Sequence, residues 1–216
     1  IQPFLRDNVG YDMDSWRYIC QTTDNPVFLL VSNGAAADSF EALMDEARSG
    51  RLIYGSSGPG TIPHLAMAAL ASEVGIDAVH LPFEGTGPAM NALAGGEIHA
   101  FADTPSVLES HDVKALAVFA EERLPAYPDI PTLAELGHDL SFSVWQAIFA
   151  PAGLSDADAN RFAAACEQAL NSEQFQTLAE RIKTTIRYRG PEALETFVRN
   201  NAALNQRVLQ DAGLTR

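Results

Sequence analysis

Short apolar runs alternate with amphipathic stretches along most of the chain, from residue 27 to its C-terminal end. Apolar runs of about four to eight residues predict strands, whereas longer stretches with a helical period predict helices. We expect strands at 27–32, 52–54, 78–83, 97–103, 113–120 and 142–149. We expect helices at 39–49, 63–74, 88–94, 131–136 and 191–211, and two more that begin at 155 and about 173. This alternation predicts an α/β protein with mostly parallel sheets.

Capping and proline signals support the predicted helices. Ser39 is a suitable N-cap, and Gly50 follows the end of the same helix. Three later helices have a proline in the first turn, where its missing N–H costs nothing: Pro63, Pro88 and Pro191. The first 25 residues predict little regular structure except near 17–21. Regular structure is therefore expected mainly after residue 25.

The composition is that of a globular protein rather than a membrane-spanning or nucleic-acid-binding one. The 216 residues are 47% hydrophobic, which is enough for one large domain or two lobes. No apolar run approaches the roughly 20 residues that cross a bilayer, and the first residues do not resemble a signal peptide. The net charge of -14, from 14 basic and 28 acidic residues, argues against a nucleic-acid partner.

The cysteines and histidines do not form a metal or catalytic motif. Cys20 and Cys166 match no CxxC or zinc-ligand spacing, and we interpret them as buried thiols, with one disulfide as the alternative. The five histidines contain no HExxH pair, and no Ser/His/Asp set can be assigned. We therefore predict no cofactor, no metal and no catalytic residues.

The segment 54–63 is the strongest candidate for a binding site. It runs from a strand end through glycines and hydroxyl residues into a helix start, where exposed N–H groups and the helix dipole favour an anion. It is neither a Walker loop nor a GxSxG elbow. A tight turn without a ligand is the alternative. The predicted ligand-binding residues here are Gly55, Ser56, Ser57, Gly58, Gly60, Thr61 and His64, although a helix-surface position is the commoner case for a histidine such as His64.

Two further segments are expected at the same edge of the sheet. Glu84, Gly85 and Thr86 precede the next helix, and Asp103 and Thr104 end the strand at 97–103. Ligands of open α/β sheets bind beyond the carboxyl ends of the strands, which predicts that these residues line one crevice. A tight turn at 84–86 and a turn cap at Asp103 are the alternatives. No Lys or Arg lies in these loops, so backbone N–H groups would have to meet an anion's charge.

An ordered set of motifs resembles the tripartite tricarboxylate transporter solute-binding family, known as TctC or Bug. The motifs are YGSSGPGT at 54–61, VHLPFEGTGPA at 79–89, LAGGEI at 93–98, LPAYPDIPTLAELG at 124–137 and FAPAG at 149–153. They occur in the family's order and approximate spacing. No single motif is specific, but the set covers essentially the whole chain.

The resemblance implies a type II periplasmic binding fold, with two lobes and a ligand cleft between them. Lobe I would contain residues 1–25 and 138–216 and would lack the family's N-terminal segment, whereas lobe II, at 26–137, would be complete. It also implies a monomeric periplasmic protein that delivers a small carboxylate to the membrane subunits of a tripartite transporter. The ligand class would be a di- or tricarboxylate, an amino acid or an aromatic acid.

Two departures from the family leave the ligand open. The family commonly has Lys or Arg where Glu84 stands, and often Asp-Asn where this chain has Asp103-Thr104. A serine-dependent hydrolase or transferase using Ser56 or Ser57 is one alternative, and the lack of an assignable base counts against it. A truncated relative that no longer binds a ligand is the other.

Overall fold

The computed structural model describes residues 1–6, 9–211 and 213, which form two compact units. Unit 1 contains residues 1–25 and 145–210, and unit 2 contains residues 26–144 together with 211 and 213. Residues 138–144, which we assigned to lobe I, thus lie in unit 2. The assignment of the units as lobes of a binding cleft stays a prediction, and each unit is described by itself.

Unit 2 contains two small sheets that backbone hydrogen bonds connect. Strand β2 (Phe28–Ser32) lies between β5 (Phe101–Asp103) and β6 (Val113–Val118) and is antiparallel to both. Strand β3 (Leu52–Ser56) pairs in parallel with β4 (Ala78–Pro82). The N–H of His99 donates to the Ile53 carbonyl at 2.8 Å, and that of Gly55 donates to the Ala100 carbonyl at 3.0 Å. These bonds join β3 to the segment that leads into β5.

The prediction of mostly parallel sheets is wrong for the sheet around β2. The residues from Val27 to Val31 are all 0% exposed, and such a continuous apolar run is typical of a strand covered on both faces. Burial on both faces does not fix strand direction. The apolar run at 27–31 therefore predicted the position of the strand correctly, but the expected parallel direction of its neighbouring strands was wrong.

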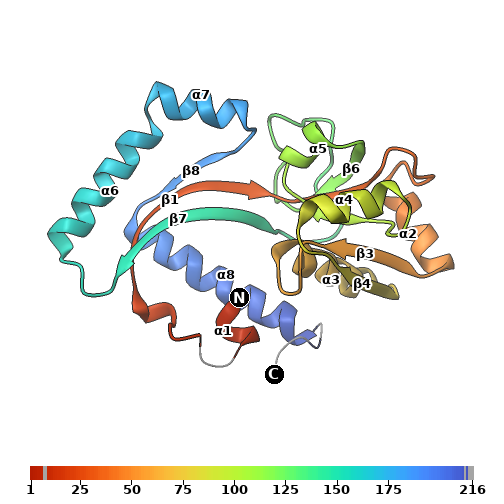
Figure 1. The fold of residues 1–216 in the computed structure, drawn as a ribbon, viewed down its shortest axis with the longest axis horizontal. Coiled ribbons are helices and arrows are strands. Elements are labelled where there is room, and N and C mark those ends of the chain that lie inside the picture. Colours follow the sequence, from red (N-terminus) through yellow and green to blue (C-terminus); the bar gives the residue numbers. More distant parts are fainter. Residues whose placement is uncertain (7–8, 212, 214–216) are drawn as a thin grey trace. The chain divides into compact units, whose positions relative to one another are not determined.

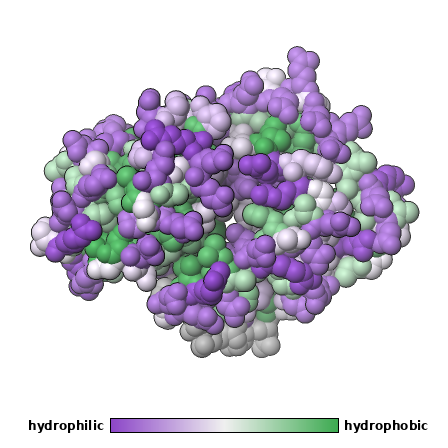
Figure 2. Space-filling model, turned by 180° about the vertical axis from the view of Figure 1, so that it is seen from behind, coloured by the Kyte–Doolittle hydropathy of each residue, from purple (hydrophilic) through white to green (hydrophobic). Residues whose placement is uncertain are grey.

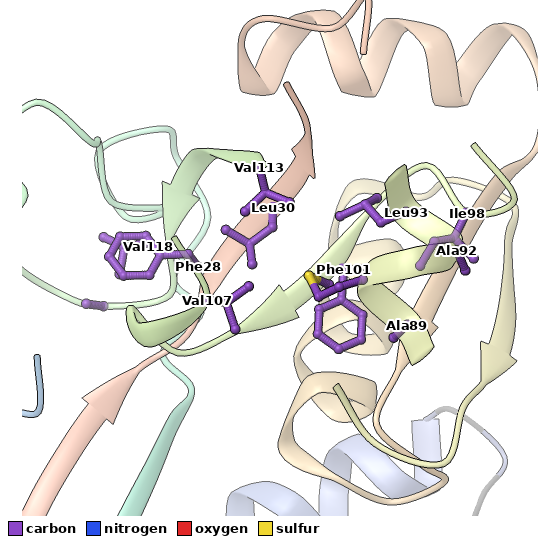
Figure 3. Packing of buried hydrophobic residues seen from close by; sticks show 12 residues of the cluster. Phe28, Leu30, Ala89, Ala92, Leu93, Ile98, Phe101, Val107, Val113 and Val118 are labelled. Carbon is purple, nitrogen blue, oxygen red and sulfur yellow. The ribbon is translucent and has the colours of Figure 1, made fainter. Parts of the chain in front are cut away.

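The helices of unit 2 are α2 (Phe40–Ser49), α3 (Ile62–Val74), α4 (Thr86–Ala94) and α5 (Ser106–Ser110). The first three confirm predicted helices. The Ser39 hydroxyl caps α2 by accepting from the Ala42 N–H at 3.2 Å, as predicted. Side chains from α4 and the strands pack into one apolar cluster, in which Ala89, Leu93 and Phe101 lie close together (Figure 3).

Two predicted elements of unit 2 are shorter or absent. The strand expected at 97–103 begins only at Phe101, because the N–H groups of Glu97 and Ile98 donate to the Ala92 carbonyl and close the end of α4. The segment 131–136 forms turns rather than a helix. The Leu133 N–H donates to the Val118 carbonyl at 2.9 Å, so this segment runs along β6 and does not form a helix.

Unit 1 contains a three-stranded sheet in which β1 (Trp16–Pro26) lies between β7 (Ser143–Pro151) and β8 (Ile186–Arg189). The helices are α1 (Gln2–Leu5), α6 (Asp156–Leu170), α7 (Glu173–Arg181) and α8 (Pro191–Asp211), with a short 3-10 turn at Met13–Ser15 (Figure 1). Helices α6, α7 and α8 and strand β7 confirm the predicted elements. Among the described residues, no helix is both long and apolar enough to cross a membrane.

The expectation of little regular structure before residue 25 is wrong outside 17–21, because β1 is an eleven-residue strand that contains and extends beyond this segment. Its polar residues gave a weak strand signal, but the buried Gln21 and Asn25 have hydrogen-bond partners. The Asn25 side-chain oxygen accepts from the Thr185 N–H at 2.8 Å, and Gln21 accepts from Arg189 of β8. Buried polar groups need such partners, and here the neighbouring strand supplies them.

The two cysteines form a disulfide between β1 and α6, so the interpretation as buried thiols is wrong and the alternative is correct. Cys20 is 0% and Cys166 7% exposed, within an apolar cluster that includes Ile19 and Leu170.

Hydrophilic side chains cover most of the face in Figure 2, with smaller apolar areas between them. That distribution agrees with the composition and net charge of the sequence.

Candidate functional site

Three strand ends meet at one edge of unit 2. Tyr54 of β3 pairs with His80 of β4 and with Ala100, the residue before β5, and both pairings are parallel. Strands β3, β4 and β5 therefore end at the same edge. The Phe83 N–H donates to the Ser56 carbonyl at 3.0 Å, and a Cβ placed on Gly58 would lie 3.9 Å from the Phe83 carbonyl oxygen. We call residues 57–61, 83–87 and 103–104 together the loop edge. The structure thus brings together the three predicted binding segments.

The first loop of the loop edge has a defined conformation. The Thr61 hydroxyl donates to the Gly58 carbonyl at 2.8 Å, and the Ser56 hydroxyl accepts from the Gly58 N–H at 3.2 Å. The φ angles of Gly58 and Gly60 are +132° and +72°, which side-chain-bearing residues rarely adopt. These two glycines are therefore required by the backbone path from β3 to α3.

Helix starts leave several backbone donors free at the loop edge. Within the described part of the chain, the N–H groups of Ser57, Ile62 and His64 donate to no hydrogen bond. The same holds for Thr86 and Gly87 at the start of α4. Unsatisfied N–H groups and the positive end of the helix dipole attract anions. The loop edge can therefore receive an anion without a basic side chain.

The predicted site residues differ in exposure. Ser57, Gly58, Thr61, Gly85, Thr86 and Thr104 are partly exposed, and Glu84 is exposed. Gly55, Ser56, Gly60 and His64 are buried. A Cβ on Gly55 would lie 2.5 Å from Ile98 Cδ1, so this glycine is needed for packing. His64 is only 3% exposed, so the alternative of a helix-surface histidine is wrong.

Asp103 connects the starts of two helices. One oxygen of its carboxylate, Oδ2, accepts from the Thr86 hydroxyl at 2.7 Å. The other, Oδ1, accepts from the Thr104 N–H at 2.7 Å and from the Thr104 hydroxyl at 3.2 Å. The Asp103 side chain is 8% exposed and caps the turn, which is the role given above as the alternative to ligand contact. It also holds Thr86 in place beside the loop edge.

A group of aromatic side chains, the buried Tyr54 and His64 and the partly buried His80, lies directly behind the first loop. The imidazole rings of His64 and His80 stack with centroids 3.7 Å apart and an interplanar angle of 11°, and Tyr54 stacks on His80 at 5.2 Å. The Ser56 hydroxyl lies 2.6 Å from His80 Nε2. Sequence reasoning missed the roles of Tyr54 and His80. One signal was available in the sequence: each residue stands two positions before the end of its strand. Parallel pairing of β3 and β4 therefore places the two residues side by side.

Burial makes these side chains hard to ionise. Burial, and then the neighbouring His80, lowers the pKa of His64 to about 4, and burial also lowers the pKa of His80. Burial raises the pKa of Tyr54 to about 12. All three side chains are therefore neutral at pH 7.

We predict that acid destabilises unit 2 through His64. Its pKa of about 4 in the folded chain lies below the unfolded value of 6.5, so the unfolded state binds more protons between these pH values. Stability should thus be complete above about pH 6.5 and fall by on the order of 3 kcal/mol as the pH drops to about 4. Urea unfolding at pH 7.5, 5.5 and 4 measures this fall. His64→Asn, which does not titrate, should show a smaller fall, and an equal fall would contradict the prediction.

The contact between Ser56 and His80 resembles a nucleophile with its base, but its setting does not suit catalysis. Ser56 is 0% exposed, so its hydroxyl does not face solvent. Among the described residues, no group of three or more His, Cys, Asp or Glu side chains could hold a metal ion. The geometry of the loop edge favours binding over a reaction at Ser56.

A cavity of about 440 Å³ lies in unit 1. Trp16, Tyr18 and Arg199 are among its lining residues, and Arg199 forms ion pairs with Asp14 and Glu195. None of the predicted ligand-binding residues lines this cavity. The other arginine of the lining, Arg17, is paired with Asp156. Because both arginines already pair with carboxylates, the cavity offers an anion less than its arginines suggest.

The chain is similar to curated bacterial proteins. A UPF0065 protein of Bordetella pertussis is 30% identical over 182 residues, which cover 81% of this chain and 56% of that protein. Protein BugT of the same organism is 33% identical over 137 residues, covering 60% of this chain and 42% of BugT. The chain thus spans about half the length of these relatives.

Solved structures share its fold. The periplasmic binding protein BugD matches with a TM-score of 0.82 at 24% identity, over 99% of this chain and 75% of BugD. MatC of Rhodopseudomonas palustris, solved with bound malate, matches with a TM-score of 0.79 at 25% identity, over 95% of this chain and 74% of MatC. Another R. palustris protein, solved with adipate, matches with a TM-score of 0.86 at 23% identity, over 98% of this chain and 74% of that one.

These matches confirm the periplasmic-binding fold predicted from the sequence. The profile of one family, described as the tripartite tricarboxylate transporter family receptor, matches residues 1–214. Because this match covers nearly all of the 216 residues, the chain belongs to the TctC family of solute-binding proteins.

Proposed function

We propose that the chain captures a small carboxylate at the loop edge and serves an extracytoplasmic tripartite tricarboxylate-type transporter. The observation that carries this proposal is the set of free N–H groups at the starts of α3 and α4. A carboxylate has two oxygens that accept several such bonds, and N–H donors stabilise its charged form. The partly exposed Ser57 adds a hydroxyl donor to this set.

The charge distribution supports backbone recognition. The loop edge contains no Lys or Arg, and its only charged side chains are Glu84 and Asp103. Both oxygens of Asp103 already accept internal hydrogen bonds, whereas Glu84 is exposed. An anion bound here would depend on helix starts for its stabilisation, as other anion sites at helix N-termini do. Glu84 would then oppose the binding of a carboxylate.

The relatives and the disulfide support the ligand class and the compartment. MatC and the second R. palustris protein were solved with malate and adipate, both of which are dicarboxylates. Malate and adipate are therefore the first probes for this chain. The disulfide between Cys20 and Cys166 suits an oxidising compartment such as the periplasm, where disulfides persist.

A ligand panel tests the proposal. Malate, adipate, citrate, benzoate and glutamate are added to the chain, and the unfolding temperature and the heat of binding are measured. At least one carboxylate should bind saturably, and at 100 times its Kd it should stabilise the chain by about 2.7 kcal/mol. The ligand should be recovered unchanged. Covalent labelling of Ser57 by a serine-directed probe, together with turnover of a panel member, would instead support the hydrolase alternative.

We predict that Glu84→Gln strengthens dicarboxylate binding by about two- to threefold, because it removes a screened like charge from the loop edge. Glu97→Gln is the matched control, since Glu97 is also exposed and follows the opposite end of α4. The ratio of Kd values from calorimetry measures the effect. Equal changes in the two variants would assign the effect to net charge and not to the position of Glu84.

A further inference from the structure

The loop between β3 and α3 is held by a buried imidazole. The Gly60 N–H donates to Nδ1 of His64 at 3.0 Å, and both residues are buried. This bond closes the loop onto the first turn of the helix that follows it. It also means that Gly60, although a predicted ligand-binding residue, gives its N–H to His64.

A second set of contacts extends this support to the strand before the loop. His80 stacks on His64 with centroids 3.7 Å apart, and its Nε2 lies 2.6 Å from the Ser56 hydroxyl. The Ser56 hydroxyl in turn lies 3.0 Å from the Gly58 carbonyl oxygen and accepts from the Gly58 N–H. The two imidazoles therefore contact the loop at both of its ends.

We propose that His64, supported by the stacked ring of His80, is a positioning residue: it holds loop 56–61 in the conformation that leaves the N–H groups of Ser57, Ile62 and His64 free for a carboxylate. This inference rests on the proposed function. It replaces the predicted ligand contact of the His64 side chain with an indirect role, because its Nδ1 is already occupied by Gly60.

The role requires a neutral His64. Nδ1 accepts a hydrogen bond from the Gly60 N–H only while it carries no proton itself. If Nδ1 were protonated, two donors would face each other. Two stacked cations 3.7 Å apart would also repel each other. The groups around the pair agree with neutrality. Strand β3 contributes Tyr54, β4 contributes His80, and Asp103 at the end of β5 has its carboxylate bonded to Thr86 and Thr104.

Two substitutions of His64 separate positioning from simple packing. His64→Leu removes the acceptor for Gly60 and should weaken the binding of malate or adipate by at least about tenfold, since loss of one bond to a buried donor is worth about that factor. In His64→Asn, the side-chain oxygen can take the place of Nδ1. We expect its Kd to stay within about threefold of wild type.

His99 supplies the matched control. Its Nδ1 accepts from the Ile53 N–H at 3.0 Å, which is the same kind of bond at the opposite end of β3. His99→Leu should therefore leave the Kd for malate and adipate within about twofold of wild type. If His99→Leu weakens binding as much as His64→Leu does, the effect comes from the stability of β3, and the proposal is wrong.

Hydrogen exchange of the Gly60 amide provides a readout that needs no ligand. Exchange should accelerate by at least about tenfold in His64→Leu, and not in His64→Asn or His99→Leu. An unchanged exchange rate in His64→Leu, or unchanged dicarboxylate binding by it, would overturn the positioning role. If wild-type protein binds no carboxylate of the panel, the proposed function fails, and the Gly60 exchange still decides whether His64 holds the loop.

Discussion

Gly58→Val should weaken dicarboxylate binding by about 10- to 100-fold. The φ angle of Gly58 is +132°, a conformation that valine adopts only with strain of about 1–3 kcal/mol. A Cβ at this position would meet no atom closer than 3.7 Å, so the effect comes from the backbone and not from a clash. The loop should relax, and relaxation would displace the Ser57 N–H and the Thr61 bond to the Gly58 carbonyl. Calorimetric Kd values for malate and adipate measure the loss.

Gly75→Val is the matched control for this substitution. Gly75 caps the opposite end of α3 with a φ of +67°, and a Cβ there would meet no described atom within 4 Å. The control should lower the unfolding temperature through the same kind of strain, with dicarboxylate binding unchanged. Equal losses of binding in the two variants would mean that Gly58 acts only through the stability of α3.

Removal of the Cys20–Cys166 disulfide should destabilise unit 1 by about 2–5 kcal/mol. The bond joins β1 to α6 across 146 residues, and the unfolded chain without it has more conformations to lose on folding. Both cysteines belong to unit 1. Hydrogen exchange of Cys20→Ser/Cys166→Ser should therefore accelerate in β1 and α6 more than in β2 and α3.

Reduction supplies the control for the disulfide variant. Dithiothreitol should lower the unfolding temperature of the wild-type chain to that of the double variant and leave the variant unchanged. If neither reduction nor substitution changes the unfolding temperature, the disulfide does not stabilise unit 1. A change confined to β2 and α3 would contradict the assignment of its effect to unit 1.

Local signals in the sequence were sufficient to predict most helices. Ser39 and Gly50 bound α2 as expected, and Pro63 and Pro191 lie in the first turns of α3 and α8. These signals act through hydrogen bonds and backbone angles within a few residues, so they are legible without the fold. Strand β1 was anticipated only near 17–21, because polar residues such as Asn25 are stabilised by partners more than 150 residues away, here Thr185.

The loop edge was also predictable in outline, because parallel strands end at one edge and helices begin there. The roles of the individual residues within the loop edge and behind it were not predictable. The pattern could not show that Gly55 is needed for packing against Ile98, that Asp103 caps a turn, or that His64 faces the protein interior. Each of these roles depends on which side chains of neighbouring strands meet, and that is set by register and burial rather than by spacing along the chain.

The direct test of a carboxylate site at the loop edge is a backbone amide NMR titration with malate and adipate. We expect saturable shifts of the amide resonances of Ser57, Ile62, His64, Thr86 and Gly87, and we expect Gly58→Val to lose this response. Shifts that instead cluster at Trp16, Tyr18 and Arg199, around the cavity of unit 1, would contradict it.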